Sequence, residues 1–294
     1  MDSTEEFLNY LRFEKRYSPH TVQSYSTDLR QFSLFAEDFT GKGNLCEDGK
    51  IIRLWLAQLM SDGVTPRSVN RKITALRSFY KFLVREKRIS TNPMSRIQGP
   101  RVAHRLPSFV EEKQMDLLFD EVDFGDDYPG IRNRLIVAMF YHTGMRLSEL
   151  TGIRDGDIRL SEMTIRVIGK RNKERILPLT VALKELILQY LEIREQSFPT
   201  ASSFFLTDKG KPVYSRLVYR VVNKALDSVT TLSKKSPHVI RHTFATHMLN
   251  RGADLNAIKE LLGHANLAAT QVYTHNTFDK LRKVYKRAHP RAEQ

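Results

Sequence analysis

The sequence predicts a mainly α-helical protein of two domains, the second of which also carries a small β-hairpin. Apolar residues recur every three or four positions through most of the chain, as they do on one face of a helix. A single pair of segments alternates with period two, Thr164–Gly169 and Glu174–Leu179. A stretch with two prolines and no helical period, residues 99–109, separates the halves. In a chain of 294 residues we therefore expect an N-terminal helical domain at 1–98, a linker at 99–109 and a second domain at 110–294.

Three helices are predicted in the first domain, each from a start signal or break followed by an apolar stripe. One begins at Ser18-Pro19, one follows the glycine-containing break at residues 41–43, and one begins at Thr65-Pro66. Trp55, the sole tryptophan, lies in the second stripe and is expected in the core rather than as a platform for base stacking. The third helix would direct three cations away from its apolar face: Arg67, Arg71 and Lys72. These cations are either solvated or in contact with phosphates.

The second domain begins with predicted helices around residues 115–119 and 132–141, and the latter runs into the sequence HTGMRLSEL. Gly144 is expected to end one helix and Arg146 to begin the next, with Glu149 one turn along on the same face. An arginine is poorly placed against the dipole at a helix start, which indicates that Arg146 is held there for an anion. Glu149 would bind its guanidinium through a bidentate contact; the alternative is a surface ion pair that contributes almost nothing.

Two lysines lie in the turn of the predicted hairpin. Lys170 stands at the end of the first strand, and Lys173 follows it in the same turn. A turn lysine is ordinarily solvated, but a hairpin tip can also enter a DNA groove and bring an ammonium group beside a leaving oxygen. Further helices are predicted at residues 181–194, 215–229 and 278–288.

Residues 236–275 carry the densest set of chemically reactive side chains. Pro237 suits the first turn of a helix, so that His238 and Arg241 would lie on one face. A second helix would begin at the cap Asp254 and end at Gly263, which places His264 in a loop. Asn266 can cap a short helix that carries Tyr273. Any one of these residues is commonplace alone, but together they suit binding of a phosphodiester and attack by a phenol.

Composition points to a polyanionic partner and excludes several protein classes. The net charge is +14, and both parts share it: residues 1–106 hold 18 basic and 11 acidic residues, and residues 107–294 hold 29 and 22. Either both parts contact nucleic acid, or the basic surface is passive. Cys46 is the only cysteine, so neither a disulfide framework nor a cysteine metal cluster is expected. The start of the chain has no apolar signal segment, and no stretch reaches membrane-spanning length, so we expect a cytosolic protein.

The motifs resemble those of the tyrosine recombinases, and of the Xer-type resolvases most closely. The resemblance rests on RHTFATH, RGADLNAIKELLGH and the TH after Tyr273, with TGMRLSEL and VIGKRNKER earlier in the chain. It implies a SAM-like, core-binding N-terminal domain and a mostly helical catalytic domain. It also implies six catalytic residues, with Lys173 as a rival for the lysine role: Arg146, Lys170, His238, Arg241, His264 and Tyr273.

The resemblance further implies that Tyr273 forms a 3′-phosphotyrosine with a double-stranded DNA recombination site, without a metal or another cofactor. A tetramer would act on two sites, alone or with a second related recombinase, to resolve chromosome dimers, with a septum-associated DNA translocase as a candidate regulator. The segment Phe278–Tyr285 would dock on a neighbouring subunit, so that deleting residues 278–294 would spare binding to one site and abolish synapsis. The alternatives are a mobile-element integrase, a relaxing topoisomerase with the same chemistry, and a non-catalytic DNA-binding protein on this fold.

Overall fold

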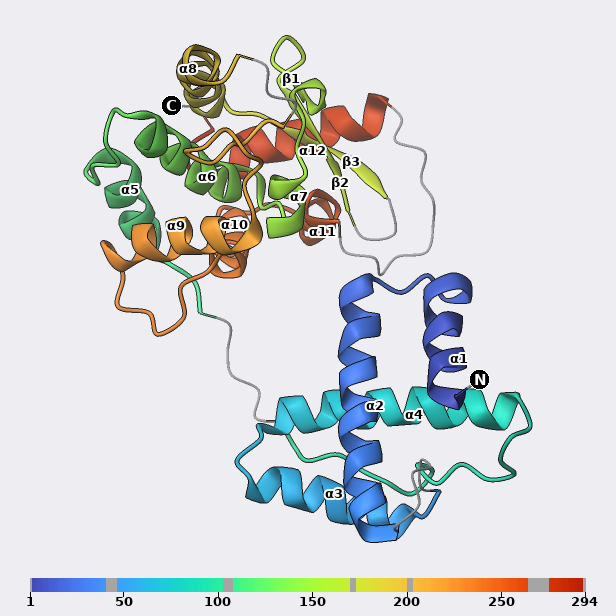
Figure 1. Ribbon diagram of the computed structural model, residues 1–294. Coiled ribbons are helices and arrows are strands. Elements are labelled where there is room, and N and C mark those ends of the chain that lie inside the picture. Colours follow the sequence, from blue (N-terminus) through green and yellow to red (C-terminus); the bar gives the residue numbers. More distant parts are fainter. Residues whose placement is uncertain are drawn as a thin grey trace. The chain divides into compact units, whose positions relative to one another are not determined.

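The computed structural model describes residues 2–40, 47–102, 108–169, 173–199, 203–263 and 275–292, with side chains from residue 281 in the last range. The chain forms two compact units, Met1–Arg105 and Leu106–Gln294 (Figure 1). It is mainly α-helical with a small antiparallel sheet, so the predicted fold class is confirmed. Among the helices within the described ranges, none is both long and apolar enough to cross a membrane.

The first unit consists of helices joined by loops and has no strand among its described residues. Its helices are α1 (Ser3–Asn9), a π-helical turn (Tyr10–Glu14), α2 (Pro19–Thr40), α3 (Gly49–Ser61) and α4 (Pro66–Arg85). The start of α4 follows the predicted signal, since the Thr65 hydroxyl accepts a hydrogen bond from Ser68 N, and Pro66 occupies the first turn. Trp55 is 3% exposed and packs against Phe32, so its assignment to the core is confirmed.

One of the three cations assigned to the outside of α4 lies inside. Lys72 is buried; its ammonium donates to Asp28 Oδ1 at 2.9 Å and lies 5.7 Å from the centre of the Trp55 ring. Asp28 is fully buried on α2 and also pairs with Arg71, which remains exposed. The prediction for Lys72 was therefore wrong, because a buried carboxylate on a neighbouring helix requires a cation beside it.

The second unit combines helices with a three-stranded antiparallel sheet, one face of which is buried. The helices are α5 (Glu112–Asp120), α6 (Tyr128–Thr143), α7 (Leu147–Thr151), a 3₁₀ turn (Asp155–Asp157), α8 (Val181–Ser197), α9 (Ser215–Asp227), α10 (Pro237–Asn250), α11 (Leu255–Leu262) and α12 (His275–Ala288). The strands are β1 (Ile158–Arg159), β2 (Thr164–Ile168) and β3 (Glu174–Pro178), in the order β1-β2-β3, with Ile165 opposite Leu177. Helix α6 packs against α8, α9 and α10, and its residues 135–141 are fully buried (Figure 1).

The end of the chain packs inside its own unit. Leu281, Tyr285 and Ala288 of α12 are buried in the core cluster of the second unit, and the Tyr285 hydroxyl donates to the carbonyl of His142 at 2.8 Å. Arg291 forms ion pairs with Asp116 and Asp120 on α5. The described part of the segment that we expected on a neighbouring subunit is thus part of this unit's core. We therefore no longer expect deletion of residues 278–294 to spare binding to a single site.

Two histidines stack within this core as neutral bases. The rings of His142 and His289 lie 5.0 Å apart at 23°, and both side chains are buried. Because His289 Nδ1 accepts a bond from Arg291 N and Nε2 donates to the Tyr141 carbonyl, its ring is held in one neutral tautomer. Burial lowers the pKa of His142 well below its usual value and that of His289 to about 3.

We expect the second unit to lose stability as the pH falls below about 6.5, the pKa of an unfolded histidine. Below that pH the unfolded chain binds protons that the buried pair excludes. The free energy of unfolding therefore falls by about 1.4 kcal/mol per pH unit for each of the two histidines. Hydrogen exchange of amides 135–141 measures this unit, while fluorescence of Trp55, the sole tryptophan, measures the first. His289→Gln should reduce the slope of the free energy of unfolding against pH by the contribution of one proton. A flat profile between pH 6.5 and 4.5 would show that the pair accepts protons in the folded state.

Candidate active site

A tight turn between α6 and α7 presents Arg146. Gly144 ends α6 in the left-handed conformation, with φ of 61°, and a Cβ there would lie 2.5 Å from Phe244 Cδ1, so the turn requires glycine. Arg146 then occupies the N-cap of α7 with extended backbone, as predicted. Its Nη1 donates to Glu149 Oε1 at 2.8 Å, and its main-chain N donates to Oε2 at 2.7 Å. The side chain of Arg146 remains 32% exposed.

Arg241 reaches the same turn from α10. Pro237 occupies the first turn of this helix, as predicted, and the Ser236 hydroxyl caps it by accepting a hydrogen bond from Val239 N. The Arg241 side chain is buried; its Nη1 donates to the Gly144 carbonyl at 2.6 Å, and its Nη2 donates to the Leu262 carbonyl at 2.6 Å. Burial, together with the nearby charges of Arg146 and a third arginine, Arg175, lowers the pKa of Arg241 to about 10. Arg241 therefore stays charged at neutral pH.

The C-terminal end of α11 holds the three arginines together. Asp254 caps the start of this helix and Gly263 ends it in the left-handed conformation, both as predicted. The last carbonyls of a helix lack partners within the helix and carry its negative dipole end, so they suit guanidinium donors. The contacts are Arg175 Nε to Leu261 O at 2.8 Å, Arg241 Nη2 to Leu262 O at 2.6 Å, and Arg146 Nη2 to Gly263 O at 2.9 Å.

Arg175 was not predicted from the sequence as part of the site. Its contacts show that Glu149 does not bind Arg146 in the expected bidentate way. The bidentate partner of Glu149 is Arg175, whose Nη1 and Nη2 donate to Oε1 and Oε2 at 2.7 and 2.8 Å. Arg146 contacts the same carboxylate with one side-chain nitrogen and one main-chain nitrogen, because it begins the helix. The period-two alternation could have indicated that Arg175 is buried, because it places Arg175 on the same buried face of β3 as Leu177.

The cluster carries excess positive charge. Burial alone would raise the pKa of Glu149, but bonds and charge from Arg175, with smaller contributions from Arg146, lower it to about 2. Glu149 is therefore ionised at neutral pH. Within the described residues, the cluster holds three guanidinium groups and one carboxylate, a net charge of +2. Buried cations need compensating charge, so this arrangement suits an anion such as a phosphodiester.

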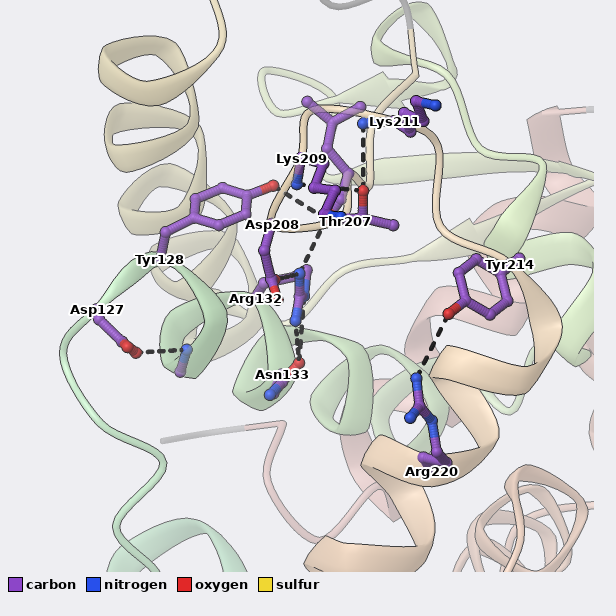
Figure 2. Close-up of polar contacts among 12 residues, drawn as sticks. Asp127, Tyr128, Arg132, Asn133, Thr207, Asp208, Lys209, Lys211, Tyr214 and Arg220 are labelled. Carbon is purple, nitrogen blue, oxygen red and sulfur yellow. Dashed lines mark hydrogen bonds and ion pairs between the residues drawn. The ribbon is translucent and has the colours of Figure 1, made fainter.

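Another buried arginine shows that burial alone does not create an anion site. Arg132 on α6 donates to the Leu206 carbonyl at 3.2 Å and forms an ion pair with Asp208, while Asn133 accepts two further bonds (Figure 2). Asp208 neutralises this guanidinium, so the contacts of Arg132 leave no excess charge. The cluster around Arg146 and Arg241 differs because its arginines outnumber its carboxylate.

The remaining predicted residues are placed only in part. His238 is the second residue of α10, exposed, one turn before Arg241. Lys170, His264 and Tyr273 lie outside the described residues, as does the predicted helix from Asn266. The rival Lys173 is exposed beside the start of β3, and its carbonyl accepts a bond from Gly169 N at 2.7 Å. The described site thus brings Arg146 and Arg241 together and adds Glu149 and Arg175.

Comparison with known proteins identifies the family. Residues 108–280 match the phage integrase family, and residues 4–87 match the phage integrase N-terminal SAM-like domain. The chain belongs to the phage integrase family of tyrosine recombinases. Tyrosine recombinase XerC of Pelobacter propionicus is 41% identical over 294 residues, covering 99% of this chain and 96% of the relative. Tyrosine recombinase XerC of Halalkalibacterium halodurans is 40% identical over 293 residues, covering 97% and 96%.

Solved structures of tyrosine recombinases share this fold. The XerH site-specific recombinase bound to palindromic difH substrate, in a post-cleavage complex, has a TM-score of 0.71 at 20% identity, over 96% of this chain and 84% of that one. The family and the XerC relatives establish this tyrosine recombinase as an enzyme of site-specific DNA cleavage and rejoining. The predicted enzyme class is therefore confirmed.

Proposed function

We propose that this tyrosine recombinase cleaves one DNA strand through a 3′-phosphotyrosine on Tyr273. The observation that carries the proposal is the arginine cluster of net charge +2 at the end of α11, which directly precedes His264. A phosphodiester develops negative charge on its non-bridging oxygens as it is attacked, and fixed cations stabilise that charge. Arg146 and Arg241 are the donors that we assign to those oxygens, and His264 adds a further hydrogen bond.

The proton transfers complete the assignment. As the bond between the Tyr273 oxygen and phosphorus forms, the bond from phosphorus to the 5′ oxygen breaks. His238 takes the phenol proton, because the pKa of histidine lies far nearer neutrality than that of tyrosine. Lys170 gives a proton to the departing 5′ oxygen, with Lys173 as its rival. Rejoining is the reverse attack by a 5′-hydroxyl, and the phosphotyrosine conserves the bond energy in between.

A nicked recombination site tests this chemistry. Cleavage next to the nick releases a short fragment, which prevents rejoining and traps the enzyme on the DNA. We expect a covalent complex that survives denaturation and carries a label placed on the strand 5′ to the cleaved phosphate, whose 3′ end is joined to Tyr273, and we expect none from Tyr273→Phe. If the wild-type chain binds the site and forms no covalent complex, it is a DNA-binding protein on this fold instead.

For the biological substrate we propose a specific double-stranded site at which chromosome dimers are resolved in the bacterial cytoplasm. The support is the similarity to relatives named tyrosine recombinase XerC over nearly the full chain. Four subunits would act on two sites, alone or with a second related recombinase, under control of a septum-associated DNA translocase. A mobile-element integrase remains the second candidate, because a Tn1549 transposon integrase bound to transposon right-end DNA shares the fold at a TM-score of 0.69. Footprinting against the host chromosome distinguishes the two.

We further propose that residues 1–98 form a core-binding domain, 99–109 a linker and 110–294 the catalytic domain. Because residues 1–106 and 107–294 each carry a net +7, both should contact phosphates. We expect residues 107–294 alone to bind the site more weakly than the whole chain, and with a shallower dependence of log K on log salt. Filter binding or fluorescence anisotropy over a salt series measures both slopes. Equal slopes would show that the first domain makes no phosphate contacts.

A further inference from the structure

The ion pair between Arg175 and Glu149 joins three elements of the proposed active site. Arg175 comes from β3, Glu149 from α7, and the Nε of Arg175 donates to the Leu261 carbonyl at the end of α11. Both side chains are buried, with exposed fractions of 5% for Arg175 and 0% for Glu149. The two parallel bonds fix the guanidinium plane, so a shift of any one element strains contacts to the other two.

Two glycines pack against this ion pair. A Cβ at Gly263 would lie 3.0 Å from Arg175 Nη1, and one at Gly169 would lie 3.4 Å from Glu149 Oε1 and 3.6 Å from Arg175 Nη1. Gly263 also has φ of 63°, so a side chain there would be strained as well as crowded. The backbone at both glycines therefore lies directly against the pair.

Each glycine immediately precedes a residue of the proposed chemistry. Gly169 is followed by Lys170, the proposed general acid, and Gly263 is followed by His264. Glu149 additionally accepts two bonds from Arg146. The buried ion pair is thus in contact with Arg146 and with the two glycines that immediately precede Lys170 and His264.

We propose that Arg175 is a positioning residue for DNA strand cleavage. It does not touch the phosphodiester; it holds the hairpin and the end of α11 in register with the helix that begins at Arg146. Misplacement of catalytic groups by about 1 Å can cost on the order of 10²-fold in rate. The inference rests on the proposed function, because it assigns Arg175 to the placement of residues whose roles are themselves proposed.

The test compares three variants of the full chain on the nicked site under single-turnover conditions. Arg175→Met keeps an unbranched apolar stem and removes the charge and the bonds. Arg175→Lys keeps the charge and loses the planar, bidentate geometry. Arg166→Met is the matched control: it removes an arginine from β2 of the same hairpin, where its ion pairs with Asp157 and Glu174 lie on the outer face.

We expect Arg175→Met to slow cleavage about 100-fold at saturating DNA, while the affinity for the site changes less than threefold. Arg175→Lys should stay at least tenfold slow, and Arg166→Met should cleave at the wild-type rate. Hydrogen exchange of the Gly169 and Gly263 amides should accelerate in both Arg175 variants and not in the control. The last measurement needs no activity, so Arg175→Lys still tests the proposal should Arg175→Met not fold.

The outcomes separate this inference from the proposed function. Absence of a covalent complex from the wild-type chain would overturn the proposed chemistry. A wild-type complex together with wild-type rates in Arg175→Met would overturn the positioning role alone. Full activity in Arg175→Lys would do the same, because it would show that charge rather than geometry is required.

Discussion

Replacement of Lys170 by alanine is expected to slow cleavage of ordinary DNA by roughly 10²–10⁴-fold, the usual contribution of a general acid. The same variant should recover most of its rate on a site whose bridging 5′ oxygen is replaced by sulfur. A 5′ alkoxide is a poor leaving group without a proton, whereas a thiolate leaves readily because thiols are far more acidic. Rates of fragment release on the two substrates measure the effect.

The other proposed residues provide the controls for this experiment. Arg146→Ala and Arg241→Ala should remain slow on both substrates, because the substitution leaves the non-bridging oxygens unchanged. Tyr273→Phe should form no covalent complex with either. Sulfur rescue of Lys173→Ala in place of Lys170→Ala would assign the proton to the rival lysine. Rescue of neither variant would mean that the proton comes from outside the hairpin.

The sulfur-substituted site also tests the positioning role proposed for Arg175. If Arg175 acts partly by placing the hairpin, Arg175→Met should recover part of its rate on the sulfur substrate. The recovery should remain incomplete, since Arg175 also contacts the end of α11 and shares Glu149 with Arg146. A structural defect spread over the whole unit would slow both substrates equally.

The features predicted correctly from sequence are those determined by neighbouring residues. Helix starts at Thr65-Pro66, Pro237 and Asp254, and the end of α11 at Gly263, follow from side-chain caps, from proline in a first turn and from the conformational freedom of glycine. The proximity of Arg146 to Glu149 follows from the three-residue spacing on a helix. Local rules of this kind need no knowledge of the rest of the fold.

The features that were missed depend on residues far apart in the chain. Glu149 and Arg175 are separated by 26 positions, and Asp28 and Lys72 by 44. A period or a spacing shows which face a residue occupies, but not which charge faces it from another element. For that reason the bidentate partner of Glu149 was misassigned, and Lys72 was expected outside although it lies in the core.

Deletion of residues 278–294 is expected to destabilise the catalytic unit severely. The deletion removes the buried side chains of Leu281 and Tyr285; losing one buried leucine or one buried aromatic typically costs about 2–5 or 3–5 kcal/mol. It also removes His289 from its stack on His142 and the ion pairs of Arg291. The combined loss is comparable to the whole stability of a typical domain, about 5–15 kcal/mol. Hydrogen exchange and limited proteolysis of the second unit measure it.

Two controls separate loss of the core from loss of assembly. Ending the chain at Ala292 removes none of the described contacts and should leave both stability and DNA binding unchanged. Tyr285→Phe removes only the hydroxyl that donates to the His142 carbonyl, so it should cost about 1–3 kcal/mol and leave the unit folded. If the chain lacking residues 278–294 instead unfolds like the full chain and binds a single site normally, α12 is not required by its own unit. A truncated chain that also fails to form four-subunit complexes would then place α12 on a neighbouring subunit.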